Sequence, residues 1–206
     1  MNPFFRTIEI LVLVVLPLLA FYLRSSWNQK EVNINVIILP LIWYIFYAPL
    51  HELGHILGCF IVGAEIKDYQ LFAHFWEGSF GFAFVEIKGG YGENMSSFVI
   101  LILPYVIDLI SIVVGYYLLT TYKIKNSFLF GLVLLLLNIR PLYDLTDNFI
   151  GYFLNHSDFV LASRIAGNLI IFSFAISSII IGATMILLLL RKFKKISKRG
   201  IRLIKN

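Results

Sequence analysis

Charged side chains are scarce in this 206-residue chain, at 14% of the residues, whereas 59% are hydrophobic and the mean hydropathy is +0.85. A typical soluble domain carries about 25% charged residues, which solvate its surface. So few charges exclude an ordinary soluble fold, because the apolar content requires lipid as the solvent. We therefore expect an integral membrane protein.

Cysteine is almost absent, since Cys59 is the only one in the chain. A single thiol excludes an intrachain disulfide and any zinc site built from several cysteines, and it says nothing about the redox compartment. We interpret Cys59 as a packing residue. The sequence also shows no internal repeat and no low-complexity segment. We expect a single membrane-embedded domain over residues 1–206, with a core at 34–155 and a basic tail at 191–206.

Long hydrophobic runs are what the sequence does contain. A helix needs about 20 mainly apolar residues to cross a hydrocarbon core about 30 Å thick. Five segments approach that length: residues 7–23, 34–63, 97–121, 127–154 and 160–190. No small-x-small cleavage pattern follows the first segment, so we interpret it as a retained helix rather than a signal peptide. The predicted fold class is an all-α polytopic membrane protein with about five transmembrane helices.

The net charge of +5 comes largely from one region, because eight of the 17 basic residues lie at positions 191–205. A basic tail directly after a transmembrane helix is typical of a segment on the anionic cytoplasmic leaflet. This favours the lipid bilayer as the partner of the tail, and we expect no nucleic-acid binding. The lysines and arginines between the hydrophobic segments then predict an N-terminus outside and a C-terminal tail in the cytoplasm.

One connection, residues 64–96, has strand character. Phe80, Phe82 and Phe84 alternate with smaller residues, and glycines punctuate the run. Period-two alternation bounded by glycine is typical of a β-hairpin or an edge strand. The alternative is an irregular interfacial loop with aromatic anchors.

The strongest functional pattern is HELGH at residues 51–55. On a helix, His51 and His55 share one face and can bind one metal ion through their imidazole nitrogens, with Glu52 beside a metal-bound water. Zinc lowers the pKa of such a water towards about 7, and a carboxylate can then remove its proton. The alternative is a polar cluster that bridges helices, but ionisable side chains inside a membrane favour a functional role.

A catalytic zinc needs a third protein ligand and an open fourth position. His74 and His156 fit poorly, because His74 lies in the predicted hairpin and His156 just beyond the fourth hydrophobic segment. The carboxylates of the fourth segment are better placed. Alternate segments run in the same direction, which brings Asp147 to the depth of the two histidines. Asp144, one helical turn earlier, is the rival ligand.

With HELGH and the polar residues of the fourth segment, the chain resembles the site-2 protease family of intramembrane zinc metalloproteases. HELGH matches the family's HExxH motif, and the family's Asn-Pro/Leu-Asp-Gly type segment, two spans later, resembles four residues here: Asn138, Pro141, Leu145 and Asp147. Asn148 stands where the family usually has glycine, and Thr146 separates the leucine from the aspartate. The resemblance covers residues 34–155. It implies Zn²⁺ held by two histidines and Asp147, with Glu52 as the general base.

The resemblance also implies hydrolysis of peptide bonds within or beside the membrane, with a membrane-anchored polypeptide as substrate. Two other functions stay open. One is a zinc-binding membrane scaffold or chaperone without protease activity, against which the intact Glu52 argues. The other is a small ion transporter, for which paired inverted repeats would be expected.

Two groups of residues are predicted to bind the substrate. The Asn138 amide can stabilise developing negative charge on the substrate, although hydrogen bonding between helices is an equally good interpretation. The segment of residues 76–87, with Phe80, Phe82 and Phe84, is expected to bind an unwound substrate by strand addition, since exposed backbone in a membrane needs hydrogen-bonding partners.

Two observations disagree about which face of the membrane lies nearer the active site. In the site-2 protease family it is generally nearer the cytoplasm, whereas the distribution of basic residues puts His55 and Asp147 towards the outside. A re-entrant segment near residues 143–164 would change the count of membrane crossings and reverse that assignment.

Overall fold

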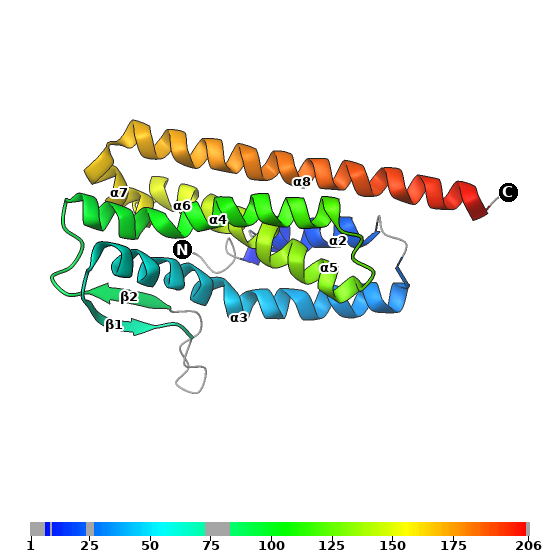
Figure 1. The fold of residues 1–206 in the computed structure, drawn as a ribbon, viewed down its shortest axis with the longest axis horizontal. Coiled ribbons are helices and arrows are strands. Elements are labelled where there is room, and N and C mark those ends of the chain that lie inside the picture. The colour runs from blue at the N-terminus through cyan, green and yellow to red at the C-terminus, as the bar shows by residue number, and fades with distance from the viewer. Residues whose placement is uncertain (1–6, 9, 24–26, 73–82, 205–206) are drawn as a thin grey trace. The chain divides into compact units, whose positions relative to one another are not determined.

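The computed structural model of the chain describes residues 7–8, 10–23, 27–72 and 83–204. These residues form a mostly helical fold with one small sheet (Figure 1), which confirms the predicted fold class. With η marking a π-helical turn, the elements in chain order are η1 (Leu11–Val15), α2 (Leu16–Leu23), α3 (Gln29–Val62), β1 (Ile66–Gln70), β2 (Phe84–Ile87), α4 (Met95–Thr121), α5 (Ser127–Leu134), η3 (Leu135–Ile139), α6 (Arg140–Phe153), α7 (Asp158–Ala166) and α8 (Asn168–Ile204).

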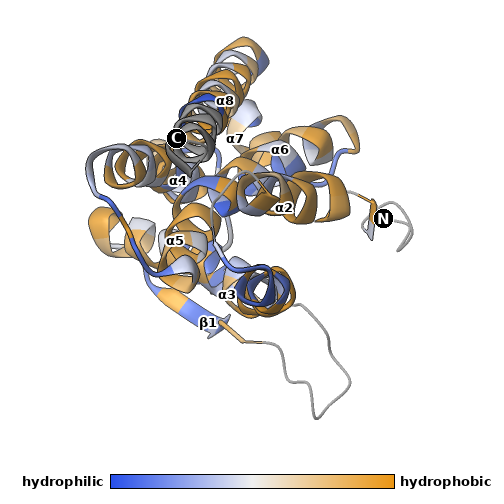
Figure 2. Ribbon diagram, turned by 90° about the vertical axis from the view of Figure 1, so that its right-hand side faces the viewer, coloured by the Kyte–Doolittle hydropathy of each residue, from blue (hydrophilic) through white to orange (hydrophobic). Residues whose placement is uncertain are grey.

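Four helical stretches are long and apolar enough to cross a membrane: Gln29–Val62, Met95–Thr121, Ser127–Phe153 and Asn168–Phe193. They correspond to the second to fifth predicted segments. The first predicted segment forms a shorter apolar helix, Leu11–Leu23. Hydrophobic residues, drawn in orange, dominate α2, α4 and α5 in Figure 2. These helices have the character of a multi-pass membrane protein.

The fifth predicted segment differs in one respect, because it is divided into two helices. Helix α7 ends at Ala166 and α8 begins at Asn168. Between them Gly167 has φ +91°, a value that side-chain-bearing residues rarely adopt. Hydropathy averaged along the segment does not register a break made by one glycine.

The chain divides into two compact units, which we describe separately. Unit 1 is drawn from Met1–Trp43, Ser111–Tyr143 and Ile180–Asn206, and unit 2 from Tyr44–Ile110 and Asp144–Ile179. The helices α3, α4, α6 and α8 each contribute residues to both units. The expectation of a single domain over residues 1–206 stays a prediction.

Unit 1 has an aromatic core. Phe21, Tyr22 and Trp27 pack their rings against Phe130 of α5. The Tyr22 hydroxyl donates a hydrogen bond of 2.7 Å to the carbonyl oxygen of Ser127. A buried hydroxyl costs free energy unless it is hydrogen-bonded, so this bond lets a tyrosine occupy an otherwise apolar position.

The passage from α5 to α6 in unit 1 runs through the π-helical turn η3. Pro141 has no N–H for the carbonyl four residues earlier, and the N–H of Arg140 bonds to the Leu135 oxygen with the wider π-helical spacing. Asn138 lies in this turn and is fully buried. Its amide occupies the space that a Cβ at Gly115 would need.

Unit 2 contains the sheet. Strands β1 and β2 pair in antiparallel fashion, with an irregularity in the register between Ile66 and Asp68. Val85 and Ile87 of β2 pack against Cys59 of α3 and Ile100 of α4. Cys59 is fully buried in this cluster, which confirms its interpretation as a packing residue.

The sheet confirms the predicted strand element in the part that the structure describes. Phe84 pairs with Gln70 and lies on the face of β2 opposite Val85, with 39% of its surface exposed. Phe80 and Phe82, the other two members of the predicted alternation, lie outside the described residues.

Candidate metal centre

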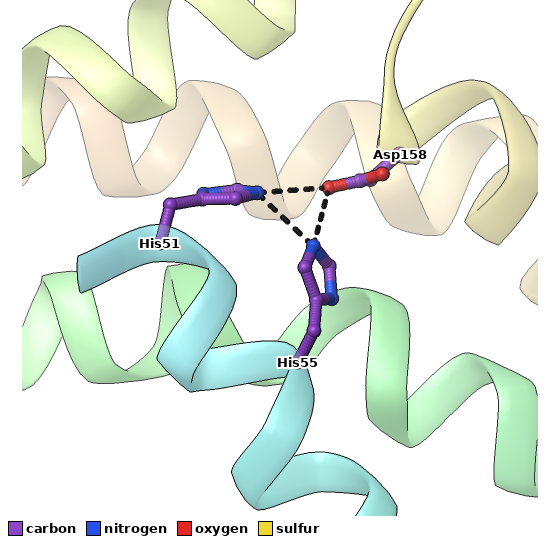
Figure 3. A group of neighbouring side chains, drawn as sticks. All are labelled: His51, His55 and Asp158. Carbon is purple, nitrogen blue, oxygen red and sulfur yellow. Dashed lines mark hydrogen bonds and ion pairs between the residues drawn. The ribbon is translucent and has the colours of Figure 1, made fainter. Parts of the chain in front are cut away.

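Unit 2 brings two histidines and one aspartate to a single point (Figure 3). His51 and His55 project from one face of α3, as their spacing predicts, and Asp158 is the first residue of α7. His51 Nε2 lies 3.1 Å from His55 Nε2 and 3.2 Å from Asp158 Oδ2. His55 Nε2 lies 3.2 Å from the same oxygen. The three atoms form a nearly equilateral triangle.

This triangle has the dimensions of one face of a metal coordination tetrahedron. Zinc bonds of about 2.0–2.1 Å to nitrogen and oxygen set neighbouring ligand atoms about 3.3 Å apart. The observed separations of 3.1 and 3.2 Å are close to that value. Two imidazoles and one carboxylate leave a fourth position open, as in catalytic rather than structural zinc sites. The three residues could therefore hold a metal ion.

The second ring nitrogen of each histidine has a hydrogen-bond acceptor. His51 Nδ1 lies 2.8 Å from Asp144 Oδ2, and His55 Nδ1 lies 2.9 Å from the carbonyl oxygen of Ile100. Ionised carboxylates and carbonyl oxygens only accept, so both Nδ1 atoms donate, and a neutral ring then keeps a lone pair on Nε2. Metal-ligating histidines in proteins almost always have such partners. With Asp158 Oδ2, three electron-pair donors face one another and need positive charge between them.

Asp144 is fully buried, and both of its carboxylate oxygens are hydrogen-bonded. Oδ2 accepts from His51, and Oδ1 accepts from the Asn148 side-chain amide at 3.2 Å. Asp144 and Asn148 lie one turn apart on α6, so the amide fixes the carboxylate from the same helix. The carboxylate in turn fixes the orientation of the His51 ring.

Asp158 is held on both sides. The Tyr105 hydroxyl of α4 donates to Asp158 Oδ2 at 2.8 Å. On its other side, Asp158 Oδ2 faces Nε2 of both histidines at 3.2 Å. Its carboxylate can serve as an anionic ligand of a metal ion bound between these three atoms.

A tight turn between α6 and α7 places Asp158, the first residue of α7, next to the two histidines. Asn155 has φ +56°, and the His156 N–H bonds to the Gly151 carbonyl at 2.8 Å. A Cβ at Gly151 would come within 2.5 Å of the His156 carbonyl oxygen. Asparagine is one of the few residues other than glycine that closes a helix in this conformation. Ser157 then occupies the N-cap position of α7 with extended backbone.

The structure thus brings Asp158, rather than the expected Asp147, to the two histidines. Asp147 lies 3.5 Å from the Tyr47 hydroxyl and is not among the residues of the metal-binding group in the described part of the chain. Asp144, the rival, contacts the far nitrogen of His51. The sequence does carry a signal for Asp158, because NHSD at residues 155–158 joins a helix-stop residue to a helix-start pair. Asp158 lies between two hydrophobic segments, so a prediction restricted to those segments does not include it.

The remaining predicted site residues are less directly described. Glu52 is half-buried on α3 and is not a member of the metal-binding group in the described part of the chain. Asn138 belongs to unit 1, and Phe84 lies on the exposed face of β2. The substrate-binding roles of Asn138, Phe84 and the undescribed Phe80 and Phe82 stay predictions.

Comparison with known proteins yields no relative. No protein-family model matches the chain, and neither a curated protein nor a solved structure matches it. The function must therefore be inferred from the side chains of unit 2.

Proposed function

We propose that this chain is an intramembrane zinc metalloprotease that cleaves membrane-anchored polypeptides. One observation carries the proposal: the Nδ1 atoms of His51 and His55 each face an acceptor, while both Nε2 atoms face one oxygen of Asp158. The HExxH pattern and the four apolar helices support it further. The third ligand in this proposal is Asp158.

The donor atoms favour zinc over other metals. Calcium and magnesium prefer oxygen ligands, whereas two of the three donors here are imidazole nitrogens. Two histidines, one carboxylate and an open position form a donor set typical of hydrolytic zinc sites. When bound, zinc would lower the pKa of a coordinated water towards about 7 and polarise the carbonyl of a peptide bond.

Glu52 is the proposed general base. It is adjacent to His51 and one helical turn before His55 on α3, and it is not a member of the metal-binding group. A carboxylate in this position can accept the proton that the attacking water loses and deliver it to the leaving amine. Asp144 orients His51 and Tyr105 orients Asp158, which leaves Glu52 as the group that moves protons.

The proposed substrate is a transmembrane segment that unwinds before it is cleaved. A helix uses its carbonyl groups in internal hydrogen bonds, and unwound backbone in a membrane needs new partners. Within the described residues, β2 pairs with β1 along one edge only. Its other edge offers main-chain groups for strand addition, with Phe84 on the exposed face to contact the added chain.

Metal analysis combined with a cleavage assay tests this proposal. The purified protein should bind about one zinc per chain, as a single tetrahedral centre requires, and should cleave a membrane-anchored model polypeptide. Glu52→Gln should keep the zinc and lose cleavage. A zinc scaffold would keep the zinc, but its wild-type form would show no cleavage, and a transporter would move ions into vesicles. Cleavage that persists in the Glu52→Gln variant would refute the mechanism.

A further inference from the structure

Helix α4 contains a proline, Pro104, within its membrane-spanning length. In a regular helix, the N–H of residue 104 would donate to the carbonyl oxygen of Ile100, four residues earlier. Proline has no N–H, and its ring crowds that carbonyl. Ile100 is buried, with 1% of its surface exposed. Its carbonyl oxygen therefore needs a donor from outside α4.

The donor is a side chain of the metal centre. His55 Nδ1 lies 2.9 Å from the Ile100 oxygen. This hydrogen bond keeps the proton of the neutral ring on Nδ1 and leaves the lone pair on Nε2, the atom that faces His51 and Asp158 in Figure 3. The carbonyl left free by Pro104 is therefore the one that sets the tautomer of His55.

Two glycines of α3 permit this close approach. A Cβ at Gly54 would lie 2.7 Å from the Pro104 Cα, and a Cβ at Gly58 would lie 2.8 Å from the Ile100 Cα. Real Cβ atoms essentially never come so close to another backbone. Glycines four residues apart are typical of membrane helices that pack closely. Here they meet the two residues that flank the missing hydrogen bond of α4, next to His55.

We propose that Pro104 is a positioning residue for the metal centre. By removing one donor from α4, it reserves the Ile100 carbonyl for His55 and so holds His55 in the tautomer that can bind metal through Nε2. Gly54 and Gly58 bring the two helices close enough for this bond. The inference rests on the metal site of the proposed function.

The test is Pro104→Ala, which returns an N–H to α4 and lets the Ile100 carbonyl bond within its own helix. Zinc affinity, measured by competition with a chromophoric chelator in detergent, should fall about tenfold or more, since outer partners of metal ligands contribute about 10–100-fold. The matched control is Pro40→Ala in α3, the same exchange at a position outside unit 2, where wild-type affinity is expected. Wild-type affinity in Pro104→Ala overturns the inference, whereas a wild-type protein that binds no metal overturns the proposed function.

A second measurement uses the unmutated chain, so it does not depend on the folding of a variant. With ¹⁵N-labelled histidine and isoleucine labelled with ¹³C at the carbonyl, NMR of the zinc-loaded protein should show a cross-peak between a histidine Nδ1–H and an isoleucine carbonyl. The chain has four histidines, which keeps the spectrum assignable. A His55 ring with its proton on Nε2, or without this cross-peak, overturns the inference.

Discussion

Asp158→Asn is the substitution that tests the metal centre most directly. It keeps the size of the side chain and replaces a charged ligand with a neutral amide. The Asp158 oxygen lies 3.2 Å from the Nε2 atoms of both His51 and His55, and it accepts a hydrogen bond from Tyr105. If Asp158 binds zinc, this variant loses an anionic bond to the metal itself.

Two other aspartates give a scale for the expected loss of zinc affinity. Asp144 contacts one ligand at its far nitrogen, 2.8 Å away, and such outer partners contribute about 10–100-fold, or about 1.4–2.7 kcal/mol. Asp144→Asn should fall within that range. Asp158→Asn removes a proposed direct ligand, so its loss of zinc affinity should exceed that range, at more than about 100-fold. Asp147 contacts Tyr47 at 3.5 Å and is not among the residues of the metal-binding group in the described part of the chain, so Asp147→Asn should lower zinc affinity less than Asp144→Asn does.

The assay is a chelator competition on the three variants at one pH, followed by thermal unfolding with and without zinc. A ligand that binds only the folded protein raises its unfolding temperature, so the zinc-induced rise should decrease in the same order as the affinity. The unfolding curve without zinc shows whether each variant is folded. If Asp147→Asn lost zinc while Asp158→Asn retained it, Asp147 and not Asp158 would be the third ligand.

Three further predictions concern catalysis, the predicted substrate strand and the stability of unit 1. Glu52→Gln should lower cleavage about 100-fold or more while zinc stays bound, whereas His51→Ala should lose both, as metal analysis of the two variants can show. Phe82→Pro removes a backbone donor from the predicted substrate strand, and cleavage should fall with zinc retained; undiminished cleavage would make the segment an interfacial anchor. Tyr22→Phe deletes the 2.7 Å hydrogen bond to Ser127 in unit 1 and should destabilise the fold by about 1–3 kcal/mol. Calorimetry checks the last of these, and a change in zinc affinity would contradict it.

The helices could be predicted from hydropathy because a membrane span is a local property of about 20 residues. The predicted segment 97–121 corresponds to α4, Met95–Thr121, and 127–154 corresponds to the span Ser127–Phe153. What escaped the prediction depends on single residues. Gly167 separates α7 from α8, and Asn155 closes the turn after α6. Neither changes the mean hydropathy around it.

The three residues of the candidate metal centre differ in how far their positions depend on local sequence. The pairing of His51 with His55 follows from the helical period alone, and the prediction from HELGH is confirmed by their 3.1 Å separation. The third residue comes from a different helix. The local pattern NHSD indicates the turn at Asn155, but the packing of α7 that brings Asp158 to the histidines depends on tertiary contacts. Depth along hydrophobic segments led the prediction to Asp147 and its rival Asp144, whereas Asp158 lies between the fourth and fifth segments.

Asp144 illustrates why a residue can be found from the sequence while its role is not. An ionised carboxylate that is fully buried, as Asp144 is, is strongly unfavourable unless donors surround it. Its place in a hydrophobic segment made it the rival to Asp147 as the predicted third ligand. The structure places its carboxylate against His51 Nδ1, whereas Nε2 of the same ring faces His55 and Asp158. The two ring nitrogens are about 2 Å apart by ordinary imidazole geometry, less than half the rise of one helical turn, so the choice between ligand and ligand-orienting residue is made by side-chain packing.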